Sequence, residues 1–171
     1  QGVLKVGDEI EIRPGQVYQE ANKMVHKPIT TKIVGMMTGG KKVKQIMPGG
    51  SVAVMTTLDP SVVKSDSLTG NVVGYVGDLP KVWDEFTLEV KLLERMVGSQ
   101  EDLKVDPVKM GEMLLLNVNS AATVGQVVKL SKDLVDCKLR LPVCADNESR
   151  VTISRRIGTR FRLIGYGIIK S

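Results

Sequence analysis

The sequence predicts an all-β protein built from short strands and tight turns. Three observations lead to this fold class. The 171 residues include 17 glycines and 7 prolines but only 4% aromatic residues, which favours many short elements over long helices. Hydrophobic and polar residues alternate with a period of two over much of the chain, as they do in half-buried strands. A hydrophobic content of 42% is enough for a packed core.

The first predicted elements lie in the stretch VLKVGDEIEIRPG. We expect a short strand, a turn at Gly7, and a second strand that directs Ile10 and Ile12 inward. Pro14 and Gly15 then predict the end of this strand and a reverse connection, because proline and glycine commonly interrupt strand patterns.

Three further strands are predicted in KPITTKIVGMM, PGGSVAVMTT and GNVVGYVG, which are rich in β-branched residues or bounded by turn residues. The stretch DPSVVKSD is predicted to form a single helical turn, with Asp59 as its cap ahead of Pro60. The pattern is interrupted at GDLPKVWD, just before a long strand. We therefore predict two small β domains, over residues 1–80 and 81–171.

Two strands of the second domain show the alternation most clearly, and they have the sequences DEFTLEVKLL and LVDCKLRLP. The inward-facing residues are predicted to be Phe86, Leu88, Val90 and Leu92 in the first strand and Val135, Cys137, Leu139 and Leu141 in the second. Cys137 is accordingly predicted to be a small core residue and not a nucleophile.

The C-terminal stretches RVTISRR and RFRLIGYGII also alternate, and the Gly158-Thr159 pair between them predicts a tight hairpin. The hairpin would bring together Arg155, Arg156, Arg160 and Arg162. From Arg150 to the C-terminus there are six cationic side chains and no acidic one, which creates a local positive field. These side chains could meet a phosphate or an acidic partner, or they could simply cover the solvent face of two strands.

The stretch GMMTGGKKV comes within one residue of a phosphate-binding loop. Gly35, Gly40 and Lys41 fit the pattern, but Lys42 replaces the Ser or Thr that would bind magnesium. Such a loop also needs a helix after it, and Pro48 follows too soon for one. We therefore predict a hairpin tip with exposed lysines at 41, 42 and 44, which could touch a phosphate backbone or be ordinary solvated side chains.

Composition excludes several other classes of protein. The chain has two cysteines without a C-x-x-C pair and one histidine, too few ligands for a zinc site. No apolar run is long enough to span a membrane, and the first residues lack the features of a signal peptide. These observations favour a cytoplasmic protein with no membrane partner.

Six motifs in the chain are longer and more specific: KVGDEIEIRPG, KPITTKI, PGGSVAVMTTLDPSVVKSDSLTGNVVG, LLERMVG, GEMLLLNVNSAATVG and VTISRRIGTRFRLIGYG. Together they resemble the gamma subunit family of archaeal and eukaryotic translation initiation factor two, in order and over nearly the whole chain. TTLDPSVVKSDSLTG and SRRIGTRFRLIGYG are the most particular to this family. The Gly-Asp turn with its Pro-Gly stop is shared by many translational GTPases.

This resemblance implies two consecutive β-barrels of the elongation factor Tu type. Domain two would extend to about Pro80 and domain three from about Lys81, with one or two N-terminal strands of the first barrel absent. The resemblance also implies a preceding GTPase domain in the parent subunit, which would hold GTP and Mg²⁺. This chain has neither a complete phosphate loop nor an Asn-Lys-x-Asp guanine motif. We therefore expect no catalytic residue, metal ligand or cofactor in it.

The family's function follows from the same resemblance. The parent subunit would carry initiator methionyl-tRNA to the small ribosomal subunit, as the core of a heterotrimer with alpha and beta subunits. In the family, the tRNA end lies between the GTPase domain and domain two, and the alpha subunit docks on domain two.

The predicted tRNA-binding residues are Lys41, Lys42, Gly49, Gly50, Arg155 and Arg156. Glycine permits close backbone approach, and lysine and arginine supply positive charge. The predicted partner-binding residues are Asp59, Lys64 and Asp66, and Arg160 and Arg162 are assigned mainly to the barrel surface. Two alternatives remain open: a β-barrel scaffold that binds only proteins, and the same barrels in a related factor such as the selenocysteine-specific elongation factor.

Overall fold

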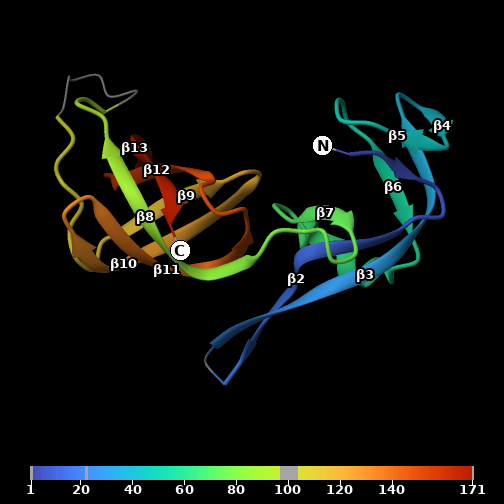
Figure 1. The fold of residues 1–171 in the computed structure, drawn as a ribbon, viewed down its shortest axis with the longest axis horizontal. Coiled ribbons are helices and arrows are strands. Elements are labelled where there is room, and N and C mark those ends of the chain that lie inside the picture. The colour runs from blue at the N-terminus through green and yellow to red at the C-terminus, as the bar shows by residue number, and fades with distance from the viewer. Residues whose placement is uncertain (1, 22, 97–103, 171) are drawn as a thin grey trace.

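The computed structural model describes residues 2–21, 23–96 and 104–170, and these residues form β-strands joined by turns, with one short 3-10 helix, η1 (Figure 1). The all-β prediction is therefore confirmed. The N-terminal elements are β1 (Leu4–Lys5), β2 (Glu9–Glu20), β3 (Lys23–Thr38), β4 (Lys41–Val43), β5 (Gln45–Ile46), β6 (Ala53–Thr56), η1 (Pro60–Asp66) and β7 (Val72–Tyr75). The C-terminal elements are β8 (Val82–Leu92), β9 (Met113–Val118), β10 (Ala121–Ser131), β11 (Leu134–Cys144), β12 (Arg150–Ile157) and β13 (Arg160–Lys170).

The strands form two bodies of different completeness, which lie side by side in Figure 1. Strands β8 to β13 close into a six-stranded antiparallel barrel in the order β10-β11-β8-β13-β12-β9, called the closed barrel here. Strands β4, β3, β2 and β7 form a curled sheet in that order, with β6 also paired to β3, and this is called the open sheet. The expectation of two barrels, the first of them incomplete, is thus confirmed.

The closed barrel has the larger core, because its strands alternate buried and exposed residues as the sequence predicts. Leu88, Leu116, Ile153 and Ile164 are completely buried in it. Burying side chains of this size contributes roughly 1.5 to 3 kcal/mol each. Cys137 is also completely buried, as predicted, and burial raises the pKa of its thiol to about 12.

The inward predictions for Leu141 and Leu92 are wrong, since these side chains are 44% and 37% exposed. The pairing between β11 and β8 shifts register between Lys138 and Val143, which ends the simple alternation. At the shift, the buried Thr123 hydroxyl accepts from the Leu141 N–H at 3.0 Å and donates to the Leu141 carbonyl at 2.9 Å. A side chain from β10 therefore satisfies this part of the strand's backbone.

The predicted strand end at Pro14 and Gly15 is also wrong, because β2 continues to Glu20 and pairs with β3 along its length. The register shifts between Ile12 and Gln16, so Pro14 and Gly15, which lie between them, are in a bulge. A proline is tolerated in a bulge because no ladder hydrogen bond needs its missing N–H. Gly15 has a φ of +86° and donates its N–H to Asn71 Oδ1 at 2.7 Å.

The helical turn predicted in DPSVVKSD is confirmed as η1. Asp59 caps it, because its carboxylate accepts a hydrogen bond from the Ser61 N–H at 2.8 Å. These contacts with Ser61 lower the pKa of Asp59. The hairpin predicted at Gly158 and Thr159 is likewise confirmed, between β12 and β13.

Candidate nucleic-acid and partner interfaces

The lysine hairpin consists of the end of β3, the Gly39-Gly40 turn and β4, and it projects from the open sheet. Lys42 pairs with Met37 and Lys41 with Thr38. The side chains of Lys41, Lys42 and Lys44 are all exposed. Both turn glycines have positive φ, and a Cβ built on either would meet no atom within 4 Å. The backbone at this tip is therefore open to close approach by a large ligand.

A second glycine turn lies beside the lysine hairpin. Gly49 and Gly50 are exposed, with φ of +121° and +73° and open space around both. The Thr38 hydroxyl at the end of β3 donates to the Ser51 carbonyl at 3.0 Å, and so ties this turn to the hairpin. The structure thus brings the predicted residues Lys41, Lys42, Gly49 and Gly50 into one region of the open sheet.

An apolar groove of about 600 Å³ lies next to these lysines. Val34, Met37, Val54 and Met55 line it and are each at least 40% exposed, and Lys42 stands in its lining. The buried core of the open sheet is correspondingly small, with Ile10, Ile33 and Met36 as its fully covered members. Sequence reasoning missed this groove, because apolar residues follow one another here without the alternation that identifies a one-sided strand.

The predicted partner-binding residues lie on a different part of the open sheet. Asp59, Lys64 and Asp66 are all exposed on η1 and at its ends. Ser61 and Val62 of the helix line a groove together with Val17 and Tyr18 of β2. Ser65 and Asp66 have φ of +58° and +55°, so the last residues of η1 form a sharp turn. Lys64 and Asp66 are thus presented to solvent on a short, well-defined turn.

The two predicted RNA-binding arginines of β12 have different surroundings. Arg155 forms a two-pronged ion pair with the Glu112 carboxylate and also donates to the backbone carbonyls of Asp106 at 2.9 Å and Pro107 at 3.1 Å. Its side chain is only 12% exposed. The charge of Arg155 is therefore met within the closed barrel, which explains how it tolerates Arg162 directly across the hairpin.

Arg156 instead points to solvent. It is exposed, and its Nε donates to the Gly158 carbonyl in the hairpin turn at 3.2 Å. Phe161 lies directly opposite on β13 and is 46% exposed, and Arg160 is exposed at the same turn. Arg156 and Arg160 are therefore grouped at the tip of this hairpin, next to an exposed aromatic ring, while the exposed Arg150 lies at its other end over the Tyr166 ring.

The structure limits the chemistry that these surfaces can perform. Lys41 to Val43 form a strand, so the stretch GMMTGGKKV lacks the helix that a nucleotide phosphate loop requires, and its residues do not fit GTP or Mg²⁺. In the described part of the chain, no group of three or more His, Cys, Asp or Glu side chains is arranged to hold a metal ion. None of the described residues forms a helix with the length and hydropathy needed to cross a membrane.

Comparison with known proteins identifies relatives along the whole chain. The family model described as "Initiation factor eIF2 gamma, C terminal" matches residues 84–169. The chain is 56% identical over 170 residues to translation initiation factor 2 subunit gamma of Thermococcus onnurineus, a match that covers 99% of this chain and 42% of that protein. The corresponding proteins of Pyrococcus abyssi and Methanocaldococcus jannaschii are 57% and 51% identical, each with 99% of this chain and 41% of the relative covered.

The chain therefore spans about two fifths of the length of the curated relatives that it matches. The closed barrel coincides with the segment matched by the family model, and the identity extends through the open sheet. On this evidence the chain belongs to the gamma subunit family of translation initiation factor 2.

Proposed function

We propose that this chain supplies RNA-facing and subunit-docking surfaces of a translation initiation factor that carries initiator methionyl-tRNA to the small ribosomal subunit. The lysine hairpin of the open sheet would contact the sugar-phosphate chain of the tRNA end. The exposed face of η1 would take part in docking the alpha subunit. In this proposal, GTP and Mg²⁺ bind to another part of the longer subunit.

The observation that carries the RNA proposal is the clustering of exposed lysines beside two open glycine turns. Lys41, Lys42 and Lys44 lie within four residues of one another, and the Thr38 contact to Ser51 holds the second glycine turn nearby. Lysine ammonium groups attract phosphates, and glycine backbone without steric cover lets a phosphate chain come close. Half or more of the hydrogen bonds in protein–DNA interfaces go to phosphate and sugar, and a hairpin of this kind suits such contacts.

The apolar groove favours a second candidate function, which is protein binding by the open sheet. Exposed apolar side chains that are grouped in this way can mark an interaction site. A scaffold that binds only proteins would use the same groove, with the lysines at its rim steering an acidic partner. The two functions differ in whether RNA binding depends on Lys41 and Lys42.

The test uses a chimera in which this chain replaces the matching segment of the Thermococcus onnurineus subunit. Binding of initiator methionyl-tRNA is measured by filter binding over a series of salt concentrations. Two lysine-to-alanine pairs are compared, at Lys41 and Lys42 and at Lys129 and Lys138. The second pair is exposed on the closed barrel and changes net charge equally.

Each phosphate contact to a single strand contributes about 0.7 to the slope of log affinity against log salt, so loss of two contacts should flatten it by about 1.4. The Lys129 and Lys138 variant should keep the slope of the parent chimera. Equal slopes in all three proteins would reject the lysine hairpin as an RNA contact. Normal alpha-subunit affinity together with no RNA binding in the unmodified chimera would favour the scaffold.

Docking of the alpha subunit is tested by calorimetry with the same chimera. Lys64→Glu and Asp66→Lys reverse two exposed charges on η1 without touching the Asp59 cap. If η1 faces the alpha subunit, one or both variants should bind it several-fold more weakly, because like charges then oppose each other at the rim. Unchanged affinity in both would exclude this face.

A further inference from the structure

The linker between the two bodies, residues 76–81, runs from β7 of the open sheet to β8 of the closed barrel (Figure 1). It contains Gly77, which allows many backbone conformations, and Pro80, which has no backbone N–H to donate. Its own turn is closed by the Asp78 N–H, which donates to the Tyr75 carbonyl at 3.1 Å. A segment of this kind would by itself allow the two bodies to change orientation.

Arg13 of β2 connects the open sheet to this linker. Its Nη1 donates to the Leu79 carbonyl at 2.8 Å and to the Pro80 carbonyl at 3.1 Å. The other edge of the same guanidinium donates from Nε and Nη2 to the two carboxylate oxygens of Glu11, at 2.8 and 3.0 Å. One planar group therefore binds the sheet on one edge and the end of the linker on the other.

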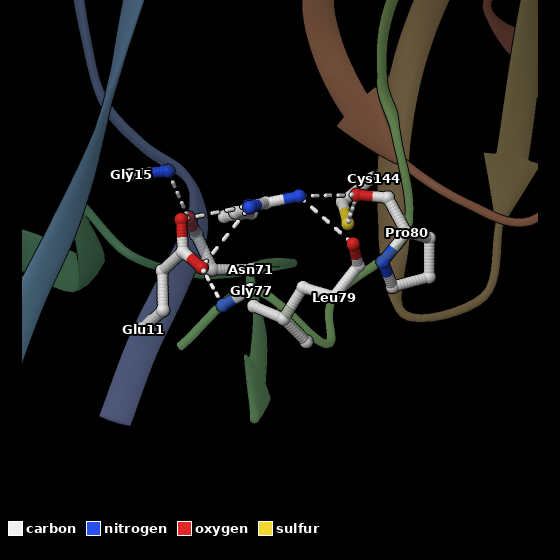
Figure 2. A network of polar contacts seen from close by, with 8 residues as sticks. Glu11, Gly15, Asn71, Gly77, Leu79, Pro80 and Cys144 are labelled. Atoms are coloured by element: carbon white, nitrogen blue, oxygen red, sulfur yellow. Dashed lines mark hydrogen bonds and ion pairs between the residues drawn. The ribbon is translucent and has the colours of Figure 1, made fainter. Parts of the chain in front are cut away.

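Glu11 secures the beginning of the linker in the same way. Its Oε2 accepts a hydrogen bond from the Gly77 N–H at 3.0 Å, as Figure 2 shows. The residue is 7% exposed, so the carboxylate is largely removed from water. Hydrogen bonds from Arg13 and then Gly77 lower the pKa of Glu11 and keep it ionised at neutral pH.

The closed barrel holds the linker from the opposite side. The Cys144 thiol donates to the Pro80 carbonyl at 3.3 Å, and the Ala145 N–H donates to the Lys81 carbonyl at 3.2 Å. Figure 2 shows Pro80 between Cys144 and the network around Glu11. The Pro80 carbonyl thus accepts hydrogen bonds from both bodies.

The two bodies also touch at other places. The His26 Nδ1 of β3 lies 3.7 Å from an Asp84 carboxylate oxygen of β8, and a further contact is apolar. A Cβ added to Gly70 would lie 2.9 Å from the Ala121 Cα, and the adjoining crevice is lined by Pro14, Leu141 and Pro142 among others. Apolar contacts are not directional, so they hold the bodies together without fixing one rotation. The hydrogen bonds of Arg13 are directional and, at 2.8 and 3.1 Å, shorter than the part-exposed His26–Asp84 pair, so they supply most of that restriction.

We infer that Arg13 is a positioning residue, which fixes the orientation of the open sheet relative to the closed barrel by holding the linker at Leu79 and Pro80. Lysine cannot replace it, because an ammonium group lacks the planar fork that reaches Glu11 and two carbonyls together. One consequence rests on the proposed function. The lysine hairpin belongs to the open sheet, and the hairpin of β12 and β13 that carries Arg156 belongs to the closed barrel. If the orientation of the two bodies is fixed, one RNA can contact both hairpins without the entropy cost of first ordering the two bodies.

The orientation can be measured by residual dipolar couplings of backbone amides in the whole chain. In the unmodified protein, one alignment tensor should fit the couplings of both bodies. Arg13→Lys keeps a positive charge beside Glu11 but loses the fork, and Arg13→Gln loses both. In each variant the common tensor should be lost, so that the two bodies need separate tensors. Arg140→Gln, at an exposed arginine on the closed barrel, is the matched control and should keep one tensor.

A single tensor that still fits both bodies in Arg13→Lys would overturn the inference, as would two tensors in the unmodified protein. If Arg13→Gln does not fold, the lysine variant decides the question. The functional consequence is tested separately by tRNA binding of the chimera. Arg13→Lys should weaken binding without changing its salt slope, whereas loss of Lys41 and Lys42 changes the slope. If the unmodified chimera does not bind tRNA, the proposed function is rejected, but the orientation measured by residual dipolar couplings still tests the role of Arg13.

Discussion

Gly15 provides a sharp test of how the open sheet is built, since alanine there should collide with backbone. A Cβ at this position would lie 2.0 Å from the Lys27 carbonyl oxygen and 2.8 Å from the Pro28 Cα. Both atoms belong to the paired strand β3, which cannot move aside as a flexible side chain can. Its φ of +86° is in the left-handed region, which costs an L-residue roughly 1 to 2 kcal/mol.

The expected cost can be assembled from these contacts. The left-handed conformation is the first part of this cost. If the backbone shifts, loss of the hydrogen bond from the Gly15 N–H to Asn71 adds about 1 kcal/mol. Gly15→Ala should therefore destabilise the open sheet by about 2 to 3 kcal/mol before any residual collision is counted. Gly40→Ala is the control, because its φ is +76° but nothing lies within 4 Å of its Cβ. It should cost only about 1 to 2 kcal/mol.

Urea unfolding, followed by far-UV circular dichroism, measures both variants. With a slope of roughly 1 kcal/mol per molar for a small unit, the Gly15→Ala midpoint should lie at least about 1 M below that of Gly40→Ala, and further below if a residual collision remains. Fluorescence of Trp83, the single tryptophan, reports on the closed barrel and should shift less than the dichroism. Equal midpoints for the two variants would refute the close packing of Gly15 against Lys27.

Three other predictions concern ionisable groups. Because the pKa of Glu11 is lowered in the folded state, its contribution to stability is present above its ordinary value of 4.5 and is lost as pH falls below that value; Glu11→Gln should remove this component from a series of thermal melts between pH 3 and 7, and an unchanged acid profile would contradict it. Because burial raises the pKa of Cys137 to about 12 and Cys144 is 2% exposed, neither thiol should react with Ellman's reagent at pH 8 until urea is added, and rapid labelling of the native protein would count against these positions. Arg155→Ala leaves Glu112 without its partner and should cost about 1 to 3 kcal/mol, whereas Arg156→Ala should be nearly neutral, so equal melting temperatures would show that the ion pair contributes little.

The hairpin of β12 and β13, called the arginine hairpin here, has one arginine in a structural ion pair and another that faces solvent. The sequence treats Arg155 and Arg156 as one pair, whereas the structure gives Arg155 a carboxylate partner and leaves Arg156 facing solvent. An RNA contact at this hairpin would therefore depend on Arg156 more than on Arg155, because a guanidinium already bound to Glu112 has fewer free donors. In the tRNA-binding assay, Arg156→Ala should therefore lower the affinity more than Arg155→Ala does.

The sequence alone determined the features that depend on neighbours along the chain. Alternation with a period of two placed Phe86, Leu88 and Cys137 in the core, because every second side chain of a strand faces the same side. Gly158 marked the arginine hairpin and Asp59 the cap of η1, since turns and caps are decided by a few consecutive residues. Family membership likewise followed from continuous motifs, and the comparisons confirm it.

The tertiary structure alone decided whatever depends on residues far apart in sequence. Glu11 lies between two inward isoleucines and would be assigned to solvent by alternation, yet it is buried because Arg13 and Gly77 meet its carboxylate. The strand continues through Pro14 and Gly15 because Asn71, 56 residues away, accepts the Gly15 N–H. Arg155 finds Glu112 across 43 residues. Such partners are brought together by the closure of the sheets, and a local pattern carries no information about which distant group will meet a buried charge or an unpaired backbone amide.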